Sequence, residues 1–399
     1  MIKIARVRLS YRGGFFASQS RSWLSTCRFL ADGSLRVESD RIGDSTSPGP
    51  GQVSVKLRAA PCTPADLRTL SAAAGVIDDA IVSRDQRLSS PPSSSSPSSS
   101  LSPLPSTSSS SSPHHLRFGF PFVGGSEALW EVTATGEGVT SLRPGDLAVP
   151  TVPDNPPGNV PETGTWRPTA TLGESSLVRV PDPPSAGGGG GIESEVAAHV
   201  SGSVATAIRI LTDFSPTKGL EKGDRVVFTG ASSAVAQILL QLAAARGLES
   251  VCLVSSEEEA ALAMSLGAWK AAQLKEFKAM RMDNACLVAD GEGGVLGFTA
   301  ARALCFRGVY VSYADASGGG ISLPVAGQIF SDTRCRGFSL ARWAVGRPAA
   351  ETRSLVEESL LAAASAGLRL EDTRRFELSE ATAAVEAAGT PGGPVLLRG

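Results

Sequence analysis

The fold is decided by residues 223–237, whose sequence is GDRVVFTGASSAVAQ. The apolar run at residues 226–228 predicts a buried parallel strand, because it is short and follows a Lys-Gly-Asp turn. A turn of small residues then leads into residues 235–245, where apolar side chains recur at helical spacing before Arg246-Gly247. A strand, a tight turn and a helix form the opening unit of a dinucleotide-binding sheet, in which N–H groups at the helix N-terminus hold a pyrophosphate.

The glycine positions of this unit depart from the usual fingerprint. Ala234 and Ala236 stand where glycines are expected. A methyl group there still allows the helix to pack on the strand, but it narrows the approach of the backbone to a phosphate. We expect the phosphate contacts of a nucleotide to come from this turn, from Ser232, Ser233, Ala234 and Val235.

The chain that follows alternates strands with helices. We expect strands at residues 251–254, 285–289 and 309–313, with helices at residues 257–266 and before Leu304. Such alternation predicts a doubly wound parallel sheet. A helix over residues 194–214 precedes this sheet.

The segments on either side of the sheet are rich in short strands. Gly/Pro turns separate apolar or alternating runs at residues 34–37, 51–60, 128–132, 147–150 and 177–180. A helix near residues 351–367 and strands at residues 375–378 and 395–397 close the chain. The fold class is therefore α/β, with a compact β-rich domain beside a parallel sheet.

Two segments fall outside this pattern. Residues 1–30 contain Lys, Arg and Ser but no acid, which is the composition of a mitochondrial transit peptide; a disordered basic tail is the alternative. Residues 88–113 are almost entirely Ser and Pro. They bury too little apolar surface to offset the entropy of ordering, so we expect a disordered surface insertion.

Composition bounds the possible functions. A chain of 399 residues is long enough for two domains, and its net charge of −2 gives no argument for a nucleic-acid partner. No stretch approaches the length of a membrane span. The six cysteines contain no Cys-x-x-Cys pair, and two of the three histidines lie near the Ser/Pro run, so a histidine-based metal site is not expected.

Several local runs resemble those of a known family. The runs are AAPCTPAD at residues 59–66, VGGSE at 123–127, RPGD at 143–146, GTWR at 164–167, TAIRIL at 206–211 and RGFSLARW at 336–343. They resemble the medium-chain dehydrogenases/reductases, and within them the mitochondrial trans-2-enoyl thioester reductases. The resemblance covers nearly everything from about residue 45 to the end, apart from the Ser/Pro run.

The resemblance implies a domain arrangement. A GroES-like catalytic domain would comprise residues 31–87, 114–185 and 335–399, and a Rossmann domain would comprise residues 186–334. The zinc-dependent relatives carry a histidine where this chain has Gly125-Ser126, and a cysteine cluster that is missing here. The chain therefore resembles the zinc-independent members.

The resemblance also implies an activity. Hydride would pass from NADPH, with NADH as a second possibility, to the β-carbon of an enoyl thioester, and a proton would pass to the α-carbon. Acyl-carrier protein or coenzyme A would carry the acyl group, in fatty-acid synthesis in the mitochondrial matrix. The resemblance further implies a homodimer formed at the sheet edge near residues 309–313. From charge and hydropathy, neither a nucleic acid nor a membrane is expected as a partner.

The catalytic positions carry the most serious departure from the family. The family's proton-donating tyrosine falls on Ala74, and an alanine can neither donate a proton nor stabilise a developing enolate. Trp166 matches a tryptophan that lines the family's active site. Ser203 replaces an asparagine on the nicotinamide side and has a shorter reach.

The expected nucleotide contacts also depart from the family. The basic pair that binds the 2′-phosphate falls on Ser255 and Glu257, on either side of Ser256. Carboxylates disfavour a phosphate, whereas an acid here binds a bare ribose 2′-hydroxyl in NAD-type sites. The run from Ser256 to Glu259 is alternatively a helix capping box.

The resemblance places the remaining cofactor contacts in two segments. The first follows the strand that lines the nicotinamide, and the second touches the cofactor through its backbone; they are Tyr313, Ala314, Asp315 and Ala316, and Phe338, Ser339 and Leu340. Tyr313 could replace the missing acid, although an aromatic residue that ends a buried strand usually packs.

Three functions remain open from the sequence. The first is an enoyl thioester reductase with altered proton delivery, from water or from Ser71, and we take it as the working hypothesis. The second is a relative that has lost catalysis and keeps a binding or structural role. The third is a quinone-reductase-like oxidoreductase, which needs no tyrosine donor.

Overall fold

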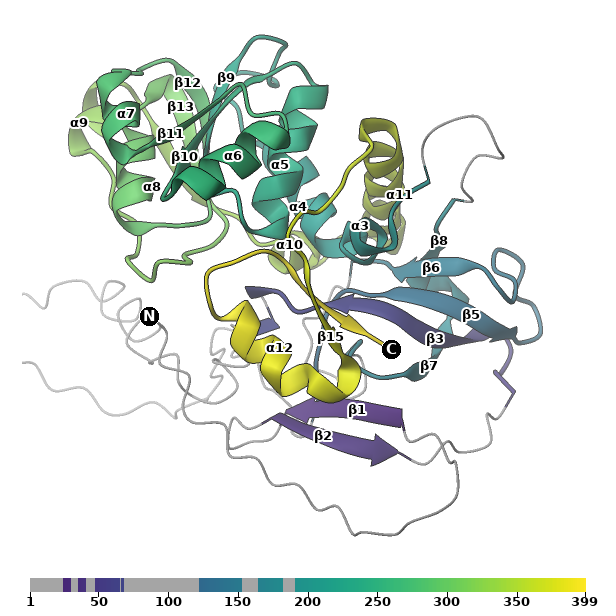
Figure 1. The fold of residues 1–399 in the computed structure, drawn as a ribbon. Coiled ribbons are helices and arrows are strands. Elements are labelled where there is room, and N and C mark those ends of the chain that lie inside the picture. Colours follow the sequence, from purple (N-terminus) through teal and green to yellow (C-terminus); the bar gives the residue numbers. More distant parts are fainter. Residues whose placement is uncertain are drawn as a thin grey trace, which may run out of the picture.

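The computed structural model describes residues 24–29, 35–40, 47–64, 66–67, 122–152, 164–181 and 191–399. These residues form a β-rich lobe and an α/β lobe (Figure 1). The Ser/Pro run lies outside the described residues, as do Ser71 and Ala74. The expected leader of residues 1–30 included Leu24–Phe29, and these six residues form strand β1 of the β-rich lobe.

The α/β lobe contains a six-stranded parallel sheet with the strand order β11-β10-β9-β12-β13-β14. The strands are β9 (Arg225–Thr229), β10 (Glu249–Val254), β11 (Lys270–Gln273), β12 (Ala285–Asp290), β13 (Leu304–Ser312) and β14 (Arg334–Gly337). The order reverses between β9 and β12, as in a doubly wound nucleotide-binding sheet. The predicted fold class is confirmed.

Helices flank this sheet, and others join the lobes. The first group is α5 (Ala234–Ala245), α6 (Glu257–Ser265), α7 (Leu274–Ala279), α8 (Gly294–Ala301) and α9 (Val325–Phe330). The second is α3 (Ser194–Ala198), the π-helical turn η2 (Val200–Val204), α4 (Ala205–Asp213), α10 (Leu340–Ala344) and α11 (Ala349–Ala366). The single helix expected over residues 194–214 is thus interrupted by η2.

The β-rich lobe is built on a seven-stranded sheet around β3 (Gln52–Pro61). The other strands are β5 (Leu129–Thr135), β6 (Leu147–Pro150), β7 (Thr169–Gly173), β8 (Leu177–Arg179), β15 (Arg374–Glu377) and β16 (Val395–Arg398). Buried and exposed side chains alternate along most of β3, as predicted for a half-buried strand. Because C-terminal β16 pairs with β3, this lobe is split around the parallel sheet.

Smaller elements complete the lobe. A three-stranded sheet joins β1 (Leu24–Phe29), β2 (Leu35–Asp40) and β4 (Phe122–Val123). Helix α12 (Ala381–Ala388) and the short 3₁₀ turns η1 (Glu174–Ser176) and η3 (Leu378–Glu380) lie between strands. None of the helices in the described ranges has the length and apolar character needed to span a bilayer.

One hydrophobic cluster spans both lobes. A single cluster of buried side chains contains Leu129 and Leu396 from the β-rich sheet together with Ile208 of α4 and Phe228 of β9. Burial of such side chains stabilises the fold by about 1.5–3 kcal/mol each. The carboxyl edge of the parallel sheet is therefore held in a fixed position relative to the β-rich lobe.

The sheet edge differs from the expectation. We expected the edge near residues 309–313, but β13 lies inside the sheet because β14 pairs with it in parallel register. Strand β14 has the sequence RCRG and is mostly exposed, so it contains no apolar run that would predict a strand.

Candidate functional site

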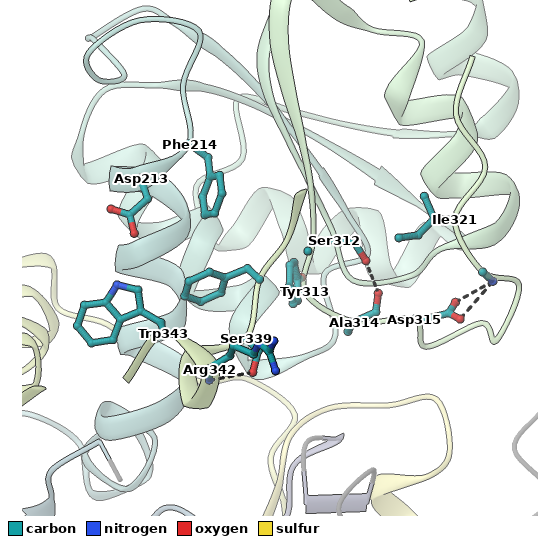
Figure 2. A pocket seen from close by; sticks show the side chains of 13 residues that line it. Asp213, Phe214, Ser312, Tyr313, Ala314, Asp315, Ile321, Ser339, Arg342 and Trp343 are labelled. Carbon is teal, nitrogen blue, oxygen red and sulfur yellow. Dashed lines mark hydrogen bonds between the residues drawn. The ribbon is translucent and has the colours of Figure 1, made fainter. Parts of the chain in front are cut away.

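A cavity of about 730 Å³ opens at the carboxyl ends of β13 and β14 (Figure 2). Ligands of doubly wound sheets bind outside the carboxyl ends of the strands, so this is the expected place for a site. Residues from five segments line it: Asp213, Phe214, Ser312, Tyr313, Ala314, Asp315, Gly320, Ile321, Gly337, Phe338, Ser339, Arg342 and Trp343.

Backbone and aromatic contacts hold the walls of the cavity. The N–H of Phe338 donates to the carbonyl of Ser312 at 2.9 Å, which ties the end of β14 to the end of β13. The ring of Phe338 meets that of Phe214 edge to face, with centroids 5.9 Å apart. Ser339 caps α10 by accepting a hydrogen bond from the N–H of Arg342 at 3.4 Å. These contacts are hydrogen bonds between uncharged groups and an aromatic contact, and none of them is an ion pair.

Cations lie along one side of the cavity. Trp343 stacks with the guanidinium groups of Arg209 and Arg347, whose centres lie 5.0 and 4.3 Å from its ring. The side chain of Arg342 is exposed at the rim (Figure 2). Arg209 is also paired with Asp213, and Arg347 with Glu351. Arg342 is therefore the lining cation that an anionic group would meet at the rim.

Tyr313 reaches from the cavity wall toward the start of α5. A side chain at Gly291 would place its Cβ 2.6 Å from the Tyr313 hydroxyl, so a glycine is required beneath the ring. Burial, with Asp290 and Glu292 nearby, raises the pKa of Tyr313 well above its ordinary value. The phenol therefore keeps its proton.

The turn between β9 and α5 is as tight as its sequence predicts. Gly230 has a φ of +71°, and an added Cβ would lie 2.6 Å from Glu292 Oε1. Ser233 is the N-cap of α5, where its hydroxyl accepts from the N–H of Ala236 at 3.2 Å. The predicted strand, turn and helix are present.

Glu259 connects this turn with the turn after β10. Its Oε1 accepts hydrogen bonds from the N–H of Ala231 at 2.7 Å and the hydroxyl of Ser232 at 2.9 Å. Its Oε2 accepts from the N–H and the hydroxyl of Ser255, at 3.0 and 2.9 Å. One carboxylate thus engages four donors at the carboxyl ends of β9 and β10.

Part of the predicted capping box is present. Ser256 is the N-cap of α6 and accepts from the N–H of Glu259 at 3.2 Å. The Glu259 carboxylate binds across the two turns, because the donors of Ala231 and Ser255 lie within its reach. Glu257, the alternative ribose contact, is exposed in the first turn of α6.

The side chains around the turns after β9 and β10 are acidic. Partial burial would raise the pKa of Glu259, but hydrogen bonds from Ser255, Ala231 and Ser232 outweigh it and lower the pKa. Partial burial and the neighbouring Glu259, Asp290 and Asp315 raise the pKa of Glu292 to about 7. A phosphate brought to this turn would meet negative charge.

A second polar cluster lies within the β-rich lobe. Asp66 accepts hydrogen bonds from Thr63 and from the hydroxyl of Ser126 at 2.9 Å. Glu127 accepts from the N–H of Ser203 at 3.0 Å and from its hydroxyl at 3.4 Å. Burial raises the pKa of Glu127 to about 8. Ser203 is therefore bonded to Glu127, which the sequence analysis did not single out.

The same contact accounts for the interrupted helix. The Glu127 carboxylate lies against Gly202, where a side chain would overlap it. The N–H of Ser203 donates to this carboxylate within η2. Single π-helical turns of this kind often accompany functional positions.

Trp166 lies in the core of the β-rich lobe. It is fully buried, its indole N–H donates to the carbonyl of Pro61 at 3.1 Å, and its ring packs against Gly125. It does not belong to the lining of the cavity. The tryptophan that the resemblance placed at the active site is therefore a buried core residue outside the lining of this cavity.

The expected cofactor residues fall into two groups. Tyr313, Ala314, Asp315, Phe338 and Ser339 line the cavity together, whereas Ala316 and Leu340 flank it. Ser232, Ser233, Ala234, Val235, Ser255, Ser256 and Glu257 form the turns after β9 and β10. Within the described part of the chain, no group of three or more His, Cys, Asp or Glu side chains could hold a metal ion.

The cavity and the turns after β9 and β10 offer different groups to a dinucleotide. The cavity offers aromatic walls, the cation of Arg342 and the carboxylates of Asp213 and Asp315. The turns at the β9–β10 end offer N–H and hydroxyl donors, which are the groups that bind ribose and phosphate oxygens. These donors are shared with Glu259.

Comparison with known proteins gives a consistent result. No protein-family model matches the chain. The chain is similar to "Enoyl-[acyl-carrier-protein] reductase, mitochondrial" of Bos taurus, at 30% identity over 234 residues, which are 56% of this chain and 58% of the relative. The protein of the same name from Arabidopsis thaliana is 30% identical over 262 residues, 63% of this chain and 65% of the relative. The matches thus span less than two thirds of these relatives.

Solved structures share the fold over nearly the whole chain. The mitochondrial 2-enoyl thioester reductase Etr1p/Etr2p heterodimer from Candida tropicalis has a TM-score of 0.70 at 20% identity, covering 95% of this chain and 100% of that one. The Etr1p/NADP/crotonyl-CoA complex has a TM-score of 0.70 at 19% identity, covering 94% and 99%.

Proposed function

We propose that this chain is an NAD(P)H-dependent reductase of trans-2-enoyl thioesters, because it has the medium-chain dehydrogenase/reductase fold and resembles mitochondrial enoyl reductases in sequence. The observation that carries the proposal is the cavity at the carboxyl ends of β13 and β14, lined by Tyr313 and Phe338. A doubly wound sheet presents its ligands at this edge.

The dinucleotide is proposed to be NADPH, with NADH as the second candidate, because the Etr1p complex contains NADP. When bound, it supplies a hydride to the β-carbon of the enoyl group. The aromatic side chains of Tyr313, Phe338 and Phe214 would shape the nicotinamide end and exclude water. The N-terminus of α5 would bind phosphate through the N–H groups of Ala234 and Val235, since that of Ala236 is bonded to Ser233.

The proton for the α-carbon needs a donor other than the family tyrosine. Tyr313 carries a protonated hydroxyl close to the cavity wall, although burial makes it a weak acid. Water entering the cavity is the other source, and Ser71 lies outside the described residues. We propose that water delivers the proton, since the 730 Å³ cavity has room for it.

The substrate and setting are proposed from the relatives. The crotonyl-CoA in the Etr1p complex supports an acyl thioester, carried by coenzyme A or acyl-carrier protein. The mitochondrial names of the relatives support the mitochondrial matrix as the location and fatty-acid synthesis as the pathway.

A homodimer is proposed through the edge of the parallel sheet. Strand β14 ends the sheet order, and nearby α9 exposes Val325, Ile329 and Phe330 to 65%, 67% and 80%. An edge strand beside exposed apolar side chains is a surface that commonly pairs with a second copy.

The test is direct. Purified chain is mixed with NADPH or NADH and crotonyl-CoA, and both nicotinamide oxidation and butyryl-CoA formation are followed. The proposal predicts butyryl-CoA in step with nicotinamide oxidation. If crotonyl-CoA is not reduced but the nicotinamide is oxidised when a quinone replaces crotonyl-CoA, the chain would be a quinone reductase and the proposal would be wrong.

A second candidate is a relative that binds a dinucleotide without turning over. Alanine at position 74 and the engagement of the Ala231 and Ser255 donors by Glu259 favour it. Dinucleotide binding without reduction of either crotonyl-CoA or quinone would identify this case.

A further inference from the structure

The contacts of Glu259 concern which dinucleotide the chain accepts. In doubly wound sheets, the loop after the second strand receives the adenosine ribose; an acid there binds the 2′-hydroxyl, and a basic residue binds the 2′-phosphate of NADPH. The corresponding loop of this chain follows β10 and begins at Ser255. Both donors of Ser255 are already bonded to Glu259.

We propose that Glu259 is a specificity-determining residue whose carboxylate occupies the donors of both turns and disfavours a dinucleotide that carries a 2′-phosphate. This inference rests on the proposed function. It differs from the usual arrangement of an acid at the strand end, because the carboxylate comes from the third residue of α6 and also reaches Ala231 in the turn after β9.

Charge and geometry act in the same direction. A 2′-phosphate entering this loop would compete with the carboxylate for the N–H of Ser255 and would be repelled by it. No Lys or Arg replaces the basic pair, since residues 255–259 are Ser-Ser-Glu-Glu-Glu. A ribose that carries a free 2′-hydroxyl could instead donate to the carboxylate. At the turn after β10, NADPH would therefore meet a penalty that NADH does not.

The neighbouring carboxylates have different roles. Glu258 is exposed, and its carboxylate interacts with the hydroxyl of Ser256 at the start of its own helix, whereas Glu259 reaches the turn after β9. A change at Glu258 removes the same charge from the same helix turn without releasing the donors. Glu258→Gln is therefore the matched control for Glu259→Gln.

The experiment measures dissociation constants of NADP⁺ and NAD⁺ by calorimetry for the full chain and for both variants. In Glu259→Gln the amide places an N–H against one pair of donors and removes the charge. We expect the dissociation constant of NADP⁺ to fall about tenfold while that of NAD⁺ stays the same or rises. Glu258→Gln should change either constant by less than about twofold.

Stability gives a second measurement. Without nucleotide, Glu259→Gln should melt at a lower temperature than the natural chain, because four hydrogen bonds to a carboxylate are weakened. When NADP⁺ is added, the difference in melting temperature between the natural chain and Glu259→Gln should become smaller or change sign. A residue with a purely structural role would lower the melting temperature equally with and without NADP⁺.

The outcomes separate this inference from the proposed function. If NADP⁺ and NAD⁺ affinities change in parallel in Glu259→Gln, or match Glu258→Gln, the inference is wrong even when the chain reduces crotonyl-CoA. If the natural chain binds neither nucleotide, the proposed function fails. In that case new NADP⁺ binding by Glu259→Gln supports the inference, and no binding by either form overturns it.

Discussion

Two parts of the carboxyl edge of the parallel sheet are built from different interactions. At the β13–β14 end, backbone pairing and aromatic contacts frame a cavity of about 730 Å³. At the β9–β10 end, a single carboxylate bridges the two turns. A wall made by packing tolerates changes in side-chain identity, whereas a site that depends on charge changes with one residue. The nucleotide fold can therefore persist while its specificity shifts.

Filling the cavity should have the largest effect. Ala314→Trp places an indole in the cavity, and we expect affinity for NADPH and NADH to fall about 1,000-fold. Calorimetry measures the loss, and circular dichroism checks the fold. Leu361→Trp, on the exposed face of α11, is the control and should bind as before. Unchanged binding by Ala314→Trp would place the nucleotide elsewhere.

Changing the tight turn tests the other end. Gly230→Ala combines a φ of +71° with a Cβ 2.6 Å from Glu292, so the free energy of unfolding should fall by about 2 kcal/mol. Urea denaturation measures it. Gly219→Ala, where an added Cβ meets nothing within 4 Å, should change stability by less than about 0.5 kcal/mol. Equal losses would mean that the turn is not constrained.

The stability of the chain should also depend on pH through Glu292, beside the turn after β9. Folding raises the pKa of Glu292 from 4.5 to about 7, so the folded state binds a proton more tightly than the unfolded state. The stability linked to this proton is present below pH 4.5 and is lost as the pH rises through 7. Between about pH 5 and 8, the natural chain should lose roughly 1 kcal/mol more stability than Glu292→Gln, after allowing for partial exposure. Parallel pH profiles would exclude this role.

The smallest effect is expected at the cavity rim. Arg342→Gln removes an exposed cation from the lining, and affinity for the dinucleotide or the acyl thioester should fall about threefold. The loss should shrink in high salt. Arg336→Gln, on β14 outside the lining, is the matched control. Equal effects of both variants would assign the loss to overall charge.

The sequence predicted the fold well where apolar patterns were strong. The β9–α5 unit, the parallel strands β10, β12 and β13, and strand β3 carried apolar or alternating runs, and each is present. Strand β14 was missed because RCRG has no apolar run and is held only by pairing with β13. The break in the helix at η2 was missed because it arises from Glu127, which is distant in sequence.

The site was predicted less completely. Tyr313 followed from its place at the end of a predicted parallel strand, whereas Phe338 was matched only through the family resemblance. The role of Glu259 could not be derived, because a capping box and a bridge between turns share the same sequence pattern. Only the distance between the turns after β9 and β10 distinguishes them.

A crystal structure of the chain with NADP⁺ tests the central claim most directly. The account predicts the nicotinamide in the cavity beside Tyr313 and Phe338, and the Glu259 carboxylate withdrawn from the N–H of Ser255. A nucleotide bound away from the β13–β14 end, or NADP⁺ bound in the cavity with Glu259 still bridging both turns, would contradict it.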